Sequence, residues 1–218
     1  MRFPGAKKGV SQVFIAEILS LIAMVLVSVP LVIFEAIGLS AFGSESMAVV
    51  MLVMMGAGAV SAILTLLLKI FGVVQASKDE ASFKGVIYAL VVDLVVTVFP
   101  LIFSSNRTLT NFAEAISDMM NGVIMVLIIV GICNLANQLG DTEMVHKGGK
   151  VFRIVIVLAV AALVMKIVMY FFPSDMGSAD TAAKVIVLIL GVLTIVFSIV
   201  QYVLYLSFLS KARKMLEQ

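Results

Sequence analysis

Residues 185–210 read VIVLILGVLTIVFSIVQYVLYLSFLS, a stretch without one charged side chain. An α-helix rises 1.5 Å per residue, so about 20 residues cross the roughly 30 Å hydrocarbon core of a bilayer. This stretch therefore predicts a helix that spans a membrane. Other long stretches carry no charge, or only one, at 18–34, 47–68, 119–140, 85–106 (Asp93) and 154–174 (Lys166).

The composition extends this conclusion to the whole chain. Of the 218 residues, 62% are hydrophobic and 13% are charged, and the mean hydropathy is +1.21. An ordinary soluble domain has about 25% charged residues, so a soluble globule and a disordered chain are excluded. Cys133 is the single cysteine and His146 the single histidine, which excludes a disulfide scaffold and a Cys/His metal centre within one chain. The net charge of +2 is too small to favour nucleic acid, and we expect no cofactor.

We predict an all-α integral membrane protein, with residues 1–218 forming one domain of six transmembrane helices. Continuous apolar stretches exclude a membrane barrel, whose strands alternate apolar and polar residues. The first apolar run is too long for a signal peptide and contains Glu17, so we expect it to be retained. The expected spans are 13–37, 47–73, 85–104, 115–139, 151–172 and 183–210.

Lys and Arg residues are concentrated on one side of this topology. The side that holds both termini carries 12 of the 15, the opposite side carries Arg107 and Lys184, and Lys166 lies within a span. Loops rich in Lys and Arg stay on the cytoplasmic side of a membrane. We therefore expect a multi-pass protein of the cell membrane with both termini in the cytoplasm.

A weak repeat indicates that the six helices form three tandem hairpins. A Lys-Gly pair precedes each odd-numbered span, at Lys8-Gly9, Lys84-Gly85 and Lys147-Gly148. Glu17 and Asp93 each follow their lysine by nine residues, whereas the third repeat has Ile156 there. Lys-Gly is also an ordinary way to enter a span, so duplication and chance both stay open.

Ionisable side chains at membrane depth cost about 2.5–3.5 kcal/mol to insert, so they mark a function or a buried partner. Asp93 lies about nine residues into its span, or about 14 Å deep. Polar residues repeat along one face of the second and sixth spans, at depths similar to that of Asp93. We predict a binding pocket open to the cytoplasm, formed by Asp93, Glu17, Lys69, Thr65 and Gln201. The alternative is hydrogen bonding between helices, which is common in membrane bundles.

A second polar cluster is expected near the outer face of the membrane. Its members are Lys166, Glu35, Glu114 and Asp118. An outer gate is one interpretation of these residues. The other is a lysine that extends to the membrane surface or pairs with an acid.

Two classes of function stay open, besides an intramembrane enzyme, which the sequence favours least. One is a small-solute or ion transporter, or a solute-binding transport subunit, that uses the pocket around Asp93. The other is an accessory or scaffold subunit that packs against a membrane-protein partner or a second copy of itself. The expected surroundings are the lipid bilayer, and the expected protein partner is another membrane protein or a second copy of this chain. We expect no enzymatic activity, because no catalytic motif of a hydrolase, metalloprotease or nucleotide-binding enzyme occurs.

Overall fold

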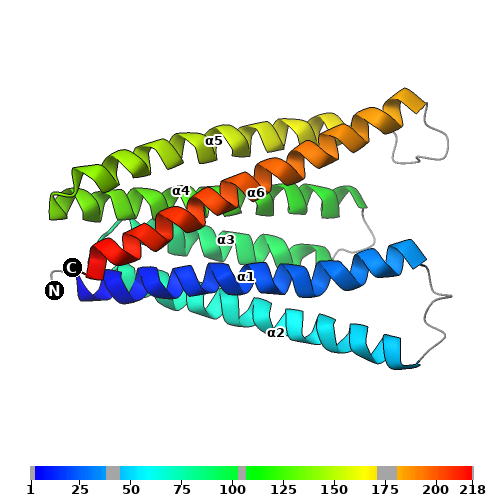
Figure 1. Ribbon diagram of the computed structural model, residues 1–218, viewed down its shortest axis with the longest axis horizontal. Helices are drawn as coiled ribbons and strands as arrows, with labels where there is room; N and C mark the ends of the chain where they lie inside the picture. Colours follow the sequence, from blue (N-terminus) through cyan, green and yellow to red (C-terminus); the bar gives the residue numbers. More distant parts are fainter. Residues whose placement is uncertain (1–2, 38–44, 103–106, 171–180, 218) are drawn as a thin grey trace. The chain divides into compact units, whose positions relative to one another are not determined.

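The computed structural model describes residues 3–37, 45–102, 107–170 and 181–217 of the chain. Over these residues the chain forms six α-helices and no strand (Figure 1). The predicted all-α membrane fold is thereby confirmed. The helices are α1 (Pro4–Ile37), α2 (Glu45–Ala76), α3 (Phe83–Ile102), α4 (Arg107–Leu139), α5 (Thr142–Tyr170) and α6 (Thr181–Glu217).

The helices have the length and the surface of membrane-spanning segments. Within the described residues, five of them contain long apolar stretches: Pro4–Ser28, Val49–Ala76, Ala115–Leu139, Thr142–Met165 and Val192–Glu217. The remaining helix, α3, has 20 residues and is therefore about 30 Å long. Leu52, Val157 and Val203 are 74%, 65% and 59% exposed. Water would penalise such exposed apolar side chains, whereas lipid accepts them.

Several helices extend past the spans expected from the sequence. The first begins at Pro4 rather than at residue 13, α5 begins at Thr142 rather than at 151, and α6 continues to Glu217 rather than ending at 210. The expected bounds follow the apolar stretches, because only those must lie in hydrocarbon. Charged residues outside the hydrocarbon do not interrupt a helix, so the helical segments continue past the membrane boundary.

The chain divides into two compact units, Met1–Asp79 and Glu80–Gln218. A single domain over residues 1–218 therefore stays a prediction. The first unit is the antiparallel hairpin of α1 and α2 (Figure 1). Gly9 and Gly72 bring its two backbones together, since a Cβ atom on Gly72 would lie 2.7 Å from the carbonyl oxygen of Gly9. Small residues at such crossings let membrane helices approach closely.

An acidic side chain fastens the two ends of this hairpin. The Asp79 Oδ2 atom accepts a hydrogen bond of 2.7 Å from the backbone N–H of Ala6. The first N–H groups of a helix have no partner within the helix, and the helix dipole favours a negative charge there. Asp79, which follows α2, therefore caps the start of α1.

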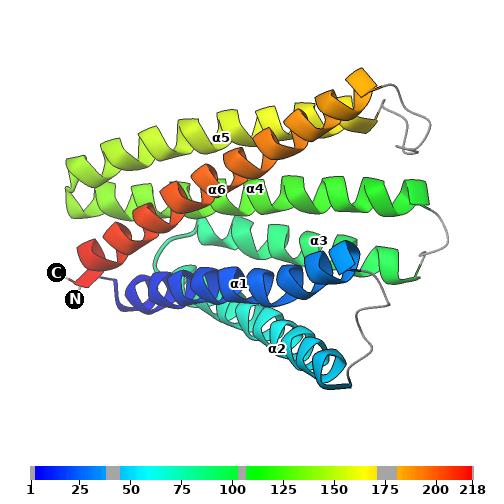
Figure 2. The ribbon, with the colours of Figure 1, turned by 45° about the vertical axis from the view of Figure 1, so that its right-hand side comes forward.

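The second unit contains α3 to α6 (Figure 2). The α4 helix packs against both α3 and α5, whereas α6 packs against α5 and more sparsely against α4. Gly140, with φ +77°, ends α4 in the left-handed conformation that suits glycine. Asp141 Oδ1 then accepts the backbone N–H of Met144 at 2.9 Å and caps the start of α5.

A network around Glu80 fastens the start of α3 to the end of α4. The Ser82 hydroxyl and the Gln138 amide donate to different carboxylate oxygens of Glu80, both at 2.8 Å. The Asn134 amide donates to Glu80 at 3.3 Å and to the Ser82 hydroxyl at 2.9 Å. Partial burial by itself raises the pKa of Glu80, but these hydrogen bonds outweigh it and hold the pKa below its usual value.

Glu80 is expected to make the α3–α4 hairpin sensitive to acid. A carboxyl whose pKa is lowered by folding stabilises the fold above its unfolded pKa of about 4.3 and loses that effect as the pH falls through the folded pKa. The Glu80→Gln variant should therefore show a smaller drop in Tm between neutral pH and about pH 3 than the parent protein. Equal acid sensitivity in the two proteins would contradict this role of Glu80.

Candidate functional site

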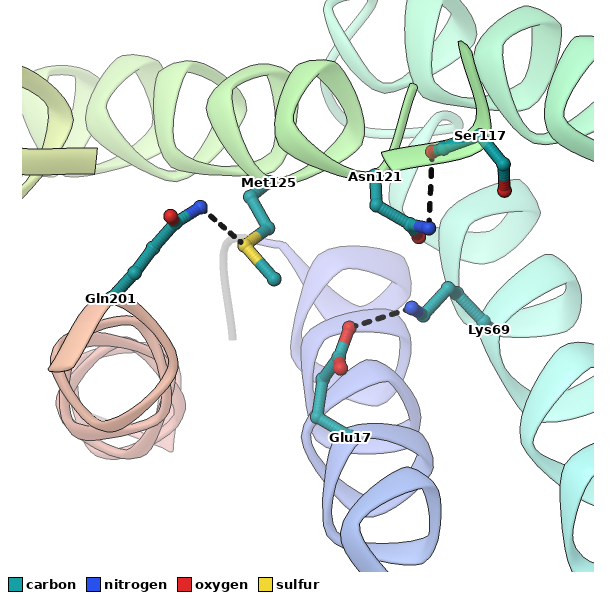
Figure 3. A network of polar contacts seen from close by, with 6 residues as sticks. All are labelled: Glu17, Lys69, Ser117, Asn121, Met125 and Gln201. Carbon is teal, nitrogen blue, oxygen red and sulfur yellow. Dashed lines mark hydrogen bonds and ion pairs between the residues drawn. The ribbon is translucent and has the colours of Figure 1, made fainter. Parts of the chain in front are cut away.

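The first unit holds a buried ion pair between its two helices. Lys69 Nζ of α2 lies 2.8 Å from Glu17 Oε1 of α1, and the two side chains point toward each other (Figure 3). The Glu17 side chain is only 2% exposed and that of Lys69 is 13% exposed. Removing two charges from water is costly and is repaid only by close pairing. The predicted proximity of Glu17 and Lys69 is thus present in the structure.

A hydroxyl group lies one helical turn from this ion pair. Thr65 precedes Lys69 by four residues on α2, so the two residues share a face. Thr65 is 9% exposed, and its Oγ1 atom has no hydrogen-bond partner among the described residues. A buried hydroxyl without a partner costs roughly 1–3 kcal/mol, so its presence here calls for an explanation.

In the second unit, Asp93 forms a polar contact between α3 and α4. Its Oδ1 atom accepts a hydrogen bond of 2.6 Å from the Ser117 hydroxyl. The Thr97 hydroxyl, one turn farther along α3, lies 3.4 Å from the same Ser117 oxygen. Asp93 therefore faces α4, and Ser117 is a contact residue that the sequence did not single out. A serine within an apolar helix carries too weak a signal to be chosen from spacing alone.

A cavity of about 570 Å³ lies between α4, α5 and α6 of the same unit. Most of its lining is apolar and includes Met119 and Met125 of α4, Ile156, Val160 and Leu163 of α5, and the backbone region of Gly122. Polar groups enter from two of the helices. These are Asp118 and Asn121 from α4, and Thr194, Ser198, Gln201 and Tyr202 from α6.

Gln201 carries a weakly satisfied hydrogen-bonding group into this cavity. Its amide Nε2 lies 3.5 Å from the thioether sulfur of Met125, across from α6 to α4 (Figure 3). A thioether is a weak acceptor, so the amide gains little from this contact. Thr194 and Ser198, by contrast, donate to carbonyl oxygens of their own helix at 2.8 and 2.9 Å. Gln201 therefore keeps the capacity to hydrogen-bond a ligand.

Ser117 links the cavity to Asp93. Asn121, which lines the cavity, donates from Nδ2 to the backbone carbonyl of Ser117 at 3.2 Å (Figure 3). The hydroxyl of the same serine donates to Asp93. Asp93 itself does not line the cavity, and it contacts α4 through the Ser117 hydroxyl.

The residues of the predicted cytoplasmic pocket lie in both units. Glu17, Thr65 and Lys69 belong to the first unit, whereas Asp93 and Gln201 belong to the second. Glu17 and Lys69 form a pair, and Gln201 lines a cavity that Asp93 approaches only through Ser117 and Asn121. One pocket containing all five stays a prediction.

Only part of the predicted outer cluster falls within the described residues. Asp118 lines the α4–α6 cavity. The side chains of Glu35, Glu114 and Lys166 lie outside the described residues, so the predicted outer gate stays a prediction. Among the described residues, no group of three or more His, Cys, Asp or Glu side chains is placed to hold a metal ion.

Comparison with protein-family models, with curated proteins and with solved structures gives no match for this chain.

Proposed function

We propose that this chain is a membrane-embedded binding protein for a small amphipathic solute and acts in its transport. The proposed site is the cavity between α4, α5 and α6. Its volume of about 570 Å³ falls within the roughly 300–1,000 Å³ typical of small-molecule pockets. Such pockets are mostly apolar with a few converging polar groups, which is the pattern of this lining.

The observation that carries this proposal is the placement of Gln201. Its amide lies inside an apolar cavity and meets the thioether of Met125. A solute with a hydroxyl, carbonyl or amide group would give Gln201 a stronger partner than sulfur. The apolar part of the solute would fill the space beside Ile156, Val160 and Leu163. A neutral or positively charged polar group fits best, because the charged side chain that the described lining contributes, Asp118, is acidic.

Asp93 has a positioning role in this proposal. It holds Ser117, and Ser117 in turn accepts the amide of Asn121 at the cavity wall. The predicted topology completes the proposal: six spans in the cell membrane, with both termini in the cytoplasm. We propose binding and transport without catalysis.

The test is to identify the compound that co-purifies with the protein and to measure how much of it is lost when a residue of the cavity lining is replaced. Full-length protein in lipid nanodiscs is extracted with organic solvent, and the extract is analysed by mass spectrometry. Gln201→Leu should lower the amount of a co-purifying amphipathic compound about tenfold. It removes one hydrogen bond to the compound, and a loss of about 1.4 kcal/mol of binding free energy corresponds to that factor. Gly122→Leu should remove the compound, since a Cβ there meets only Ala159 Cβ at 3.8 Å and the rest of the side chain enters the cavity.

The matched control is Gly149→Leu on α5. A Cβ at Gly149 meets nothing within 4 Å, and Gly149 does not line the cavity. The parent and this control should retain the compound equally. Equal extracts from the parent and from Gly122→Leu would contradict the proposal. A stoichiometric membrane protein that co-purifies with all four proteins would then favour the scaffold alternative.

A further inference from the structure

The ion pair belongs to the first unit, and neither of its residues lines the cavity or has a part in the proposed solute binding. We propose that Glu17 and Lys69 form a proton-binding site within the membrane. Glu17 takes up a proton, and the Lys69 ammonium then donates to the Thr65 hydroxyl oxygen. The proposal concerns α1 and α2 only, so it does not depend on the cavity.

The first support is the burial of the carboxylate. Glu17 is 2% exposed and has the Lys69 ammonium at 2.8 Å. On α1, the charged residues nearest to Glu17 along the chain are Lys8 on one side and Glu35 on the other. On α2, the helix packed against it, the charged residues are Glu45 at the far end and Lys69, with Lys78 and Asp79 just beyond the near end. Buried acids in membrane helices recur as proton carriers.

The second support is Thr65. A helical side chain leans toward the N-terminus of its own helix, so Lys69 leans toward the turn that contains Thr65. The Thr65 Oγ1 atom is buried and has no hydrogen-bond partner among the described residues. It is thus an acceptor one helical turn from Lys69 along α2. A purely structural ion pair does not require this unused acceptor beside it.

The step is balanced and involves no redox change. One proton from water adds to a carboxylate oxygen of Glu17, and the ion pair between Lys69 and that carboxylate is broken. Lys69 stays protonated and forms one hydrogen bond to Thr65 Oγ1. The pair thereby changes from neutral to a single positive charge. Lys69 is 13% exposed against 2% for Glu17, so the lysine is the more accessible member of the pair.

The test uses dicyclohexylcarbodiimide, which reacts with membrane-embedded carboxyl groups in their protonated form. Full-length protein in liposomes is treated between about pH 5 and pH 9, and the label on Glu17 is quantified by peptide mass spectrometry. Labelling of the parent should fall about tenfold or more across this range as the pH rises. The Lys69→Met variant should be labelled throughout, because no ammonium then favours the carboxylate.

Thr65→Val separates the proposed proton site from a structural ion pair. It keeps the shape of the side chain and removes the acceptor for Lys69, so the labelling of Glu17 at a fixed pH should fall about tenfold below that of the parent. Labelling that does not change with pH, or that appears only in Lys69→Met, would overturn the proton site. Labelling that is equal in Thr65→Val and the parent at the same pH would overturn the role of Thr65. Solute extraction from the cavity should be the same in Thr65→Val as in the parent, so failure here is distinguishable from failure of the solute site.

Discussion

Replacing Gly9 with leucine is expected to separate α1 from α2 and to destabilise the first unit strongly. A Cβ at Gly9 would lie 2.7 Å from the backbone N of Ala76 and would also meet the backbone of Gly72. Neither group is part of a flexible side chain that could move away. Overpacking of a core usually costs about 1–3 kcal/mol, and a clash with backbone lies at or above the upper end. At roughly 2–4 °C per kcal/mol, Tm should fall by about 6–12 °C.

The measurement is thermal unfolding of the full-length protein in detergent. Gly56→Leu is the matched control, because Gly56 lies on α2 and a Cβ there meets nothing within 4 Å. Leucine also has a higher helix propensity than glycine, so this control should be as stable as the parent or slightly more stable. If Gly9→Leu and Gly56→Leu unfolded at the same temperature, that result would contradict the close approach of α1 and α2 at Gly9.

Breaking the ion pair should have an effect of similar size. Glu17→Gln leaves the Lys69 ammonium without its partner, and Lys69→Met leaves the buried Glu17 carboxyl without the ammonium that favours its charged form. Removing one member of a buried pair costs about 3–5 kcal/mol, whereas replacing both members is often nearly neutral. Each single variant should therefore unfold well below the parent, and Glu17→Gln/Lys69→Met should recover most of the loss.

A double-mutant cycle on Tm and on denaturant midpoints measures this coupling. The expected interaction free energy is at least about 2 kcal/mol, because the two groups are in direct contact and poorly hydrated. Arg213 and Glu217, an i,i+4 pair with both side chains more than 40% exposed, provide the comparison. That surface pair should couple by only about 0.3–0.5 kcal/mol. Equal coupling in the two cycles would show that Glu17 and Lys69 are not a buried pair.

The fold class follows from the sequence because the bilayer leaves few alternatives. Long charge-free stretches such as 185–210 must satisfy their backbone hydrogen bonds internally, so they become helices. The ends of the helices are less predictable. Pro4 and Glu217 lie outside the hydrocarbon, where charged and apolar residues are both compatible with a helix, and hydropathy carries no signal for them.

The candidate sites were predictable only as far as local spacing reaches. Glu17 and Lys69 are charges in apolar surroundings at similar depth, so their pairing follows from the cost of leaving either alone. The cavity depends on how side chains of α4, α5 and α6 leave space between them. Gly122, Ala159 and Met125 are ordinary residues of apolar helices, and no pattern in the sequence marks them as a cavity wall.

The most direct test of the solute-binding account is an electron cryomicroscopy map of the full-length protein in lipid nanodiscs. We predict a separate density between α4, α5 and α6, in contact with the amide of Gln201 and absent from a map of Gly122→Leu. A cavity closed by its own side chains, or filled only by acyl chains continuous with the surrounding bilayer, would contradict the account.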